Sequence, residues 1–335
     1  MPTERGRGHP PPLDDNPREG WVWRMLGLLL IVAALGFAAS KAPDRPLETL
    51  VQRWAPPPSE FIDLQGQLVH LRDVGPRGDP APLLLLHGTS ASLHTWQGWV
   101  DGLQKQAPAH RVISVDLPGF GLTGPNAQDD YRTAAYVDFL QRLLSHLAVR
   151  QVVIAGNSLG GELAWEYAAA HPAQVKGLIL VDAAGYAMAP DAIPLGFRLA
   201  RIPVLGALGD YVLPRSVIER SVRAVYGDPT RIGPEVMERY FELSLRAGNR
   251  QALRHRLTQM QPGAHSEAIK SLHVPTLILW GDQDRLIPPS VAQSFAHDIA
   301  GSRLHMLPGL GHVPQEEDAQ ASLAPVLAFL PTLFP

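Results

Sequence analysis

Short apolar runs alternate along the chain with longer stretches made of strong helix formers. Three of these runs, at 83–86, 152–155 and 276–280, consist almost entirely of leucine, valine, isoleucine and other apolar residues. Such runs are typical of strands buried on both faces of a parallel sheet, and glycine or proline ends the helical stretches between them. From about residue 59 to residue 335 the pattern therefore predicts strands that alternate with helices.

The junction after the run at 152–155 combines a candidate nucleophile with the glycines that it needs. Ser158 lies in Gly156-Asn157-Ser158-Leu159-Gly160, between a predicted strand and a predicted helix. A serine on such a turn is strained, and a Cβ at Gly156 or Gly160 would collide with the adjoining strand or helix. The turn lifts the hydroxyl clear of the sheet and places it at a helix N-terminus, which favours developing negative charge. We predict that Ser158 is a nucleophile.

A serine hydroxyl also needs a base and an orienting acid. His312 is the candidate base, because it lies in a Gly/Pro-rich loop between a predicted strand and the final predicted helix. Asp284 lies just past a buried strand and is the candidate acid. Its neighbour Asp282 is the rival, and Asp182, after the sixth predicted strand, is a further alternative.

The strand at 83–86 ends in His87-Gly88, and the loop after it supplies candidate oxyanion donors. The backbone N–H groups of Thr89 and Leu159 can together hold a tetrahedral oxyanion. By analogy with such loops, we interpret His87 as a structural histidine that pins the loop, and not as the base.

With these segments in place, the chain resembles the α/β-hydrolase superfamily, whose triad follows the chain order Ser158, Asp284, His312. The resemblance covers nearly everything from about residue 60 to residue 335. It implies an eight-stranded, mostly parallel sheet with helices on both faces and a helical cap inserted after the sixth strand. The segment 116–123 usually shapes a loop beside the pocket in such proteins, and we assign it no chemistry. The matching segments are His87-Gly88, 116–123, the Ser158 turn, 281–284 and Gly311-His312.

Within the superfamily, the chain is similar to capped carboxylesterases, monoacylglycerol lipases and meta-cleavage-product C–C hydrolases. We expect hydrolysis of a carboxylic ester, with a lipid-like or aromatic acyl substrate, through an acyl-enzyme on Ser158. C–C bond hydrolysis is an alternative, although Thr89-Ser90-Ala91 replaces the proline and glycines usual there. A membrane-tethered, non-catalytic binding protein is another, but an intact Ser, Asp and His set argues against it. Serine in place of aspartate on the turn disfavours dehalogenase and epoxide hydrolase activity.

Composition narrows the possible partners. A chain of 335 residues with 45% hydrophobic residues can bury a large core, and a net charge of −3 gives no reason to expect nucleic acid. Because there is no cysteine, disulfides, thiolate catalysis and cysteine-based metal sites are excluded. The histidines show no close-set metal spacing, and we predict neither a metal nor a cofactor.

The N-terminus forms a separate module. Residues 1–20 are polar and rich in proline, so we expect them to be disordered. In the segment 21–40, the uncharged stretch 25–39 is short for a spanning helix and fits a signal-peptide core. Trp21, Trp23 and Arg24 favour an uncleaved signal anchor, with cleavage near Ser40 as the alternative. The surrounding charges place the hydrolase domain outside the cytoplasm.

Two further segments have distinct compositions. Residues 41–58 form a proline-studded linker, in which an amphipathic piece at 47–54 lies on a membrane or packs on the catalytic domain. Residues 185–271 form the candidate cap, where 11 arginines and no lysine face seven acidic residues between 187 and 265. These arginines either attract an anionic substrate or headgroup, or form a solvated face. Helical stretches of the cap are expected at 194–199, 217–226, 234–245 and 250–260.

Overall fold

A computed structural model of the chain describes residues 17–187, 202, 206 and 209–334. The chain divides into two compact units, Met1–Lys41 and Ala42–Pro335. The second unit contains every strand of the described sheet and all the candidate site residues.

Eight strands form one sheet in the order β1-β2-β4-β3-β5-β6-β7-β8. The pairs β1–β2 and β2–β4 are antiparallel, and all other neighbouring strands are parallel. The predicted eight-stranded, mostly parallel sheet is therefore confirmed. The strands are β1 (Ser59–Leu64), β2 (Gln67–Val74), β3 (Leu83–Leu86), β4 (Val112–Val115), β5 (Val152–Asn157), β6 (Val175–Val181), β7 (Thr276–Gly281) and β8 (Arg303–Leu307).

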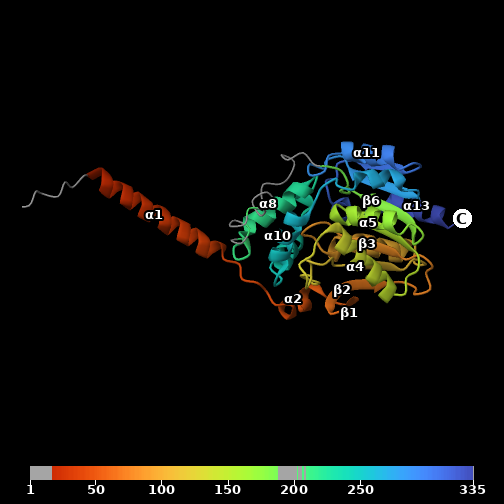
Figure 1. The fold of residues 1–335 in the computed structure, drawn as a ribbon, viewed down its shortest axis with the longest axis horizontal. Helices are drawn as coiled ribbons and strands as arrows, with labels where there is room; N and C mark the ends of the chain where they lie inside the picture. The colour runs from red at the N-terminus through yellow and green to blue at the C-terminus, as the bar shows by residue number, and fades with distance from the viewer. Residues whose placement is uncertain (1–16, 188–201, 203–205, 207–208, 335) are drawn as a thin grey trace, which may run out of the picture. The chain divides into compact units, whose positions relative to one another are not determined.

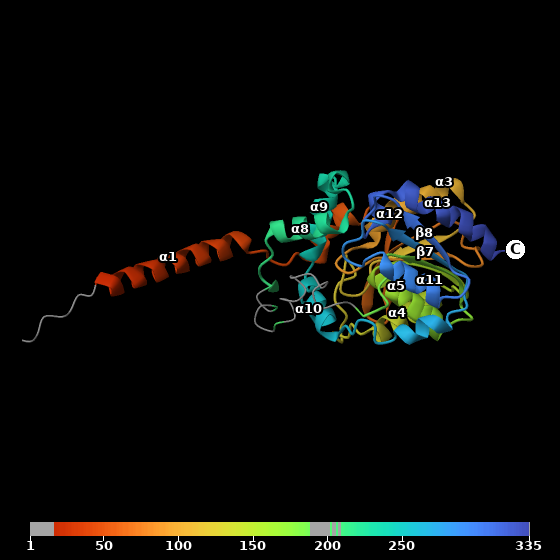
Figure 2. The ribbon, with the colours of Figure 1, turned by 90° about the horizontal axis from the view of Figure 1, so that it is seen from above.

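Helices cover both faces of this sheet, with α3, α12 and α13 on one side and α4, α5 and α11 on the other (Figure 2). Successive residues of a strand point to opposite faces, so Leu83 and Leu85 enter one hydrophobic core and Leu84 and Leu86 the other. This double burial explains the continuous apolar run of β3. The helices are α3 (Gln97–Gln106), α4 (Thr133–His146), α5 (Leu159–Ala170), α11 (Ser290–Asp298), α12 (Pro314–Glu317) and α13 (Ala319–Phe329).

Three further helices, inserted between β6 and β7, lie together beyond one end of the sheet (Figures 1 and 2). They are α8 (Arg215–Val225), α9 (Pro234–Ser244) and α10 (Asn249–Gln259), each within two residues of the stretches expected from the sequence. Val222, Tyr226 and Met237 of this insertion form a small core with Val313, the residue after His312. The arrangement is consistent with a cap over the site. The stretch expected at 194–199 lies outside the described residues.

The segment 41–58, expected to be a linker, packs on the catalytic unit through α2 (Leu47–Trp54). Leu50 and Trp54 are buried against Leu122 and Leu243. The indole N–H of Trp54 also donates a hydrogen bond of 2.7 Å to Glu242 on α9. The sequence left open whether this amphipathic helix lies on a membrane or packs on the catalytic domain. The structure shows it packed on the catalytic domain.

The described part of the first unit, from residue 17 onward, contains one helix, α1 (Pro17–Ser40). Residues 17–20, expected to be disordered, belong to this helix, and residues 1–16 lie outside the described residues. Within the described parts of the chain, no helix combines the length and the apolar character needed to cross a membrane. This finding does not support the predicted transmembrane anchor, and the location of the hydrolase domain outside the cytoplasm stays a prediction.

The contact between α3 and α13 gives a test of the packing. A Cβ added to Gly98 on α3 would collide with the Cβ of Ala319 on α13. We expect Gly98→Ala to lower the free energy of unfolding by about 1–3 kcal/mol, despite the higher helix propensity of alanine. Urea denaturation measures the change. Gly78→Ala, where nothing lies within 4 Å, is the control, and the Gly98→Ala/Ala319→Gly pair should recover stability. If Gly98→Ala were as stable as Gly78→Ala, the result would contradict this packing.

Candidate active site

Ser158 sits on a strained turn between β5 and α5. Its backbone has φ 54° and ψ −116°, a left-handed conformation that is rare for residues other than glycine. A Cβ on Gly156 would collide with the carbonyl of Gly160, and a Cβ on Gly160 with the carbonyl of Leu86. The Ser158 N–H donates to the carbonyl of Val181, at 3.1 Å, which fixes the turn to β6. Both flanking glycines are therefore needed for the close approach that exposes the serine.

His312 and Asp284 form a buried hydrogen bond of 2.7 Å between Nδ1 and Oδ2. Only 3% of His312 and 4% of Asp284 is exposed. The other oxygen of Asp284 accepts the N–H groups of Leu286, at 2.8 Å, and Ile287, at 3.0 Å. Because an ionised carboxylate only accepts hydrogen bonds, Nδ1 carries the proton and Nε2 is left as an acceptor. This is the tautomer that a general base requires.

Asn157, the residue before Ser158, connects the serine turn to the histidine loop. Its Nδ2 donates to the carbonyl of His312, at 2.8 Å, and to that of Val181, at 3.1 Å. Nε2 of His312 is buried and has no hydrogen-bond partner in the described part of the chain. A buried acceptor without a partner is costly in a purely structural histidine, but it is what a base awaiting a proton presents.

The loop after β3 passes directly against the serine. A Cβ added to Gly88 would lie 3.1 Å from the Cβ of Ser158, so a side chain there would need its neighbours to shift by a few tenths of an ångström. Thr89 follows Gly88, and Leu159 is the first residue of α5, where N–H groups lack acceptors within the helix. The structure thus places Gly88, the residue before Thr89, and the start of α5 beside Ser158, and the oxyanion role of the Thr89 and Leu159 N–H groups stays a prediction.

His87 is occupied on both ring nitrogens. Nδ1 donates to the carbonyl of Gly88, at 2.8 Å, and Nε2 accepts the N–H of Leu117, at 3.0 Å. Burial lowers the pKa of His87, so the ring is neutral at physiological pH. With both nitrogens used, His87 joins the loops after β3 and β4 and has no free position from which to act as a base.

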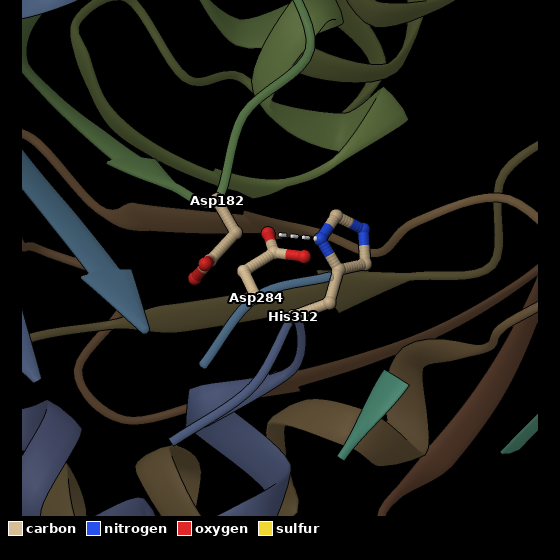
Figure 3. A group of neighbouring side chains, drawn as sticks. All are labelled: Asp182, Asp284 and His312. Atoms are coloured by element: carbon tan, nitrogen blue, oxygen red, sulfur yellow. Dashed lines mark hydrogen bonds and ion pairs between the residues drawn. The ribbon is translucent and has the colours of Figure 1, made fainter. Parts of the chain in front are cut away.

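The rival acid Asp282 lies on the surface. Its Oδ1 accepts the N–H of Gly309, at 2.8 Å, and the side-chain N–H of Gln283, at 3.1 Å. It therefore holds a turn and makes no contact with the histidine ring. Asp182 is different, because its carboxyl group lies beside those of Asp284 and His312 in a buried cluster (Figure 3). Among the described residues, this cluster is the one whose spacing would suit a metal ion.

A second buried histidine–carboxylate pair was not expected from the sequence. His70 and Asp116 are joined by a hydrogen bond of 2.7 Å, and Nε2 of His70 lies 3.0 Å from Oγ of Ser59. Ser59 has no strained turn and no helix N-terminus, and its hydroxyl also accepts a hydrogen bond from Arg72. Burial acts to raise the pKa of Asp116, but the neighbouring histidines, with His70 foremost, hold that pKa below its ordinary value. We interpret this serine, histidine and aspartate set as structural.

Several cap arginines join the cap to the catalytic core. Arg239 on α9 pairs with Glu316 on α12, and Arg256 on α10 pairs with Glu162 on α5 at 3.1 Å. Arg239 and Arg256 are almost fully buried, so they are neither a solvated face nor free to attract an anion from solution. Ion pairs between the cap and the catalytic core therefore explain part of the surplus of arginine in the cap.

A family model described as "Alpha/beta hydrolase family" matches residues 83–326. The chain therefore belongs to the α/β-hydrolase family. The relatives reported below carry hydrolase or lipase names, and we identify the protein as a hydrolase of that family.

Individual relatives are moderately similar. 2-Hydroxymuconate semialdehyde hydrolase of Pseudomonas sp. (strain CF600) is 28% identical over 245 residues, which cover 71% of this chain and 82% of that protein. Lipase 3 of Moraxella sp. (strain TA144) is 28% identical over 247 residues, covering 70% and 73%. The structure of a meta-cleavage product hydrolase from Pseudomonas fluorescens IP01 has a TM-score of 0.69 at 24% identity, covers 82% of this chain and 97% of that chain, and shows likeness of fold alone.

The choice between the two acids of the turn after β7 can be tested by labelling Ser158 with a fluorophosphonate probe. Asp284→Asn removes the acceptor for His312 Nδ1, so we expect labelling to slow by about 10²- to 10⁴-fold. Asp282→Asn removes an exposed carboxylate of the same turn and should stay within about threefold of the unaltered protein. The opposite ranking of the two variants would show that Asp282 is the orienting acid.

Proposed function

We propose that the protein is a serine hydrolase that cleaves carboxylic esters with a lipid-like or aromatic acyl group. The observation that carries this proposal is the buried hydrogen bond between Asp284 and Nδ1 of His312. It leaves Nε2 as an acceptor in a loop that Asn157 ties to the Ser158 turn. A hydroxyl on a strained turn and a base with a fixed tautomer are the two elements that acyl transfer to serine needs.

In the proposed reaction, Nε2 of His312 removes the Ser158 proton as the hydroxyl oxygen attacks the ester carbonyl. The carbonyl oxygen becomes an oxyanion, which the N–H groups of Thr89 and Leu159 bind. The imidazolium then gives its proton to the leaving alcohol, the C–O bond breaks, and the acyl group stays on Ser158. Water, deprotonated by the same nitrogen, attacks the acyl carbon and releases the acid while Ser158 regains its proton. Asp284 orients the imidazole throughout.

A pocket beside the loop after β3 supports an apolar substrate group. It lies between that loop, the loop after β4 and the ends of α9 and α10. Phe120, Leu243 and Leu253 line it together with the more polar Ser90 and Arg250. An apolar wall with few polar groups is typical of a site for a small organic ligand. The similarity to a lipase over 70% of the chain supports the same substrate class.

C–C bond hydrolysis is a second candidate, because one relative of the same identity is a 2-hydroxymuconate semialdehyde hydrolase. That relative's name specifies a reaction on a semialdehyde. The same proposed nucleophile and base would serve the cleavage of an ester bond or of a C–C bond. The two candidates differ in the electrophile, and a substrate comparison separates them.

The proposal predicts turnover of p-nitrophenyl esters of graded chain length by the full chain. Ser158→Ala and His312→Ala should each lower kcat by about 10⁴- to 10⁶-fold, and the double variant should lose little more, because the two residues act as one unit. Release of p-nitrophenolate, followed by absorbance, measures the rates. His305→Ala, an exposed histidine on β8, is the control and should change the rate less than about twofold.

Two outcomes would reject ester hydrolysis. If no ester is turned over and Ser158 takes no fluorophosphonate label, Ser158 does not accept an acyl group. That result would favour a non-catalytic binding protein. If a vinylogous diketone is cleaved with a kcat/KM far above that of every ester, C–C hydrolysis is the correct reaction.

A further inference from the structure

The mechanism proposed above uses Asp284 and His312 but gives no task to the third group beside them, Asp182 (Figure 3). Asp182 follows β6 directly and is completely buried, with 0% of its surface exposed. One ligand-type atom from each of the three residues lies within 4.8 Å of the other two. Three ionisable side chains from three separate loops therefore meet in one buried cluster.

Counting hydrogen bonds distinguishes the two carboxyl groups. Asp284 accepts from three N–H groups, two of the backbone and one of His312. Asp182 accepts from one, the N–H of Gly281, which lies 3.0 Å from Oδ1. Its Oδ2 is buried and has no donor among the described residues. An ionised Asp182 would leave that oxygen unpaired at considerable cost, whereas a protonated one can donate a hydrogen bond.

The surrounding charges also favour a protonated Asp182. Asp284 faces Asp182 from the turn after β7, Glu317 approaches from α12, and His312 lies in the loop after β8. In the described parts of the chain, no arginine or lysine forms an ion pair with Asp182 or Asp284. Burial, and then the charge of Asp284, raise the pKa of Asp182 well above its ordinary value. Two adjacent buried carboxyl groups of this kind hold one proton between them.

We propose that Asp182 carries a proton in the working enzyme and donates a hydrogen bond to Asp284, so that it acts as a positioning residue for the catalytic acid. The inference rests on the proposed function, because it explains how the acid of that mechanism is held. The proton removes the repulsion between two carboxylates, and Asp284 keeps the charge that stabilises the imidazolium. In this proposal Asp182 takes no part in the making or breaking of bonds.

A metal ion is the other means of neutralising such a cluster. Nδ1 of His312, the ring nitrogen that faces the two carboxyl groups, already donates its proton to Asp284 at 2.7 Å. A cation there would replace the hydrogen bond that orients the base, and would leave the histidine without its required tautomer. The neutralising charge is therefore assigned to a proton.

Two substitutions separate the proton from the side chain. Asp182 has φ 45°, which asparagine and glycine both tolerate, so neither variant strains the backbone. Asparagine keeps an oxygen for the Gly281 N–H and supplies an N–H donor toward Asp284, whereas glycine supplies neither. We expect Asp182→Asn to keep kcat/KM for a p-nitrophenyl ester within about threefold, and Asp182→Gly to lower it about 10- to 100-fold. A loss of that size in the asparagine variant would overturn the proposal.

The pH dependence of kcat/KM gives a readout that a merely structural role would not move. Its acidic limb reports the base of the free enzyme. If Asp182 is neutral, Asp182→Asn removes no charge and the limb stays within about 0.3 pH unit of its original position. If Asp182 is ionised, the variant removes a negative charge beside the base, and the limb moves about one unit or more to lower pH. That shift would overturn the proposal.

Thermal unfolding tests the proton without any substrate. A carboxyl group whose pKa is raised by folding contributes stability at low pH and loses it as the pH rises toward the raised pKa. The Tm of Asp182→Asn minus that of the unaltered chain should therefore increase from about pH 5 to about pH 8, since asparagine does not titrate. Asp282→Asn, the exposed neighbour of Asp284, is the matched control and should show no such trend.

The outcomes separate this inference from the proposed function. A rising Tm difference with no ester turnover would reject the function and leave the proton on Asp182. A flat Tm difference would overturn the inference even if esters are cleaved. Mass spectrometry of the purified protein tests for a stoichiometric divalent ion. If such an ion is present and is lost in Asp182→Asn, a metal and not a proton neutralises the cluster, and the inference is overturned.

Discussion

The site depends on one constraint, the close approach of the β5–α5 turn to the end of β3. Gly160 packs on the carbonyl of Leu86 at a distance that no side chain would allow, and Gly156 lets the turn close on itself. Ser158 is thereby held in a left-handed conformation next to Gly88. Ser158 and the loop that carries the proposed oxyanion donor Thr89 meet because the sheet is built that way. The substrate does not have to assemble them, and such preorganisation accounts for much of the electrostatic contribution to catalysis.

Buried charge organises the rest of the molecule around this turn. Asp116 holds the loops after β3 and β4 through the N–H groups of Leu93 and Leu122, in addition to His70. The pairs Arg239–Glu316 and Arg256–Glu162 fasten the cap helices to the core. Buried pairs of this kind add little net stability, because desolvation offsets their attraction. Their contribution here is one of register, since each fixes where a loop or a helix can lie.

The strands, the serine turn and the loops that carry Asp284 and His312 could be predicted because their signals are local. Apolar runs, flanking glycines and positions just past a strand are visible within about ten residues of sequence. The pair of His70 and Asp116 gave no such signal, because the two residues are 46 positions apart and meet only through the sheet. The packing of α2 on α9 and the docking of the cap arginines are long-range contacts of the same kind. The predicted membrane anchor is not supported, because no helix in the described part of the chain is both long and apolar enough to span a bilayer.

Hydrogen bonds join the loop that carries His312 directly to the cap. The N–H of His312 donates to the carbonyl of Val225 at the end of α8, at 2.7 Å. Glu317 accepts the N–H groups of Gly227 and Asp228 in the cap and of Gly311 beside the base. The cap and the position of His312 therefore cannot diverge independently in this protein. A cap exchanged for that of a relative would bring a different end of α8, and with it a different hydrogen bond to the backbone of His312.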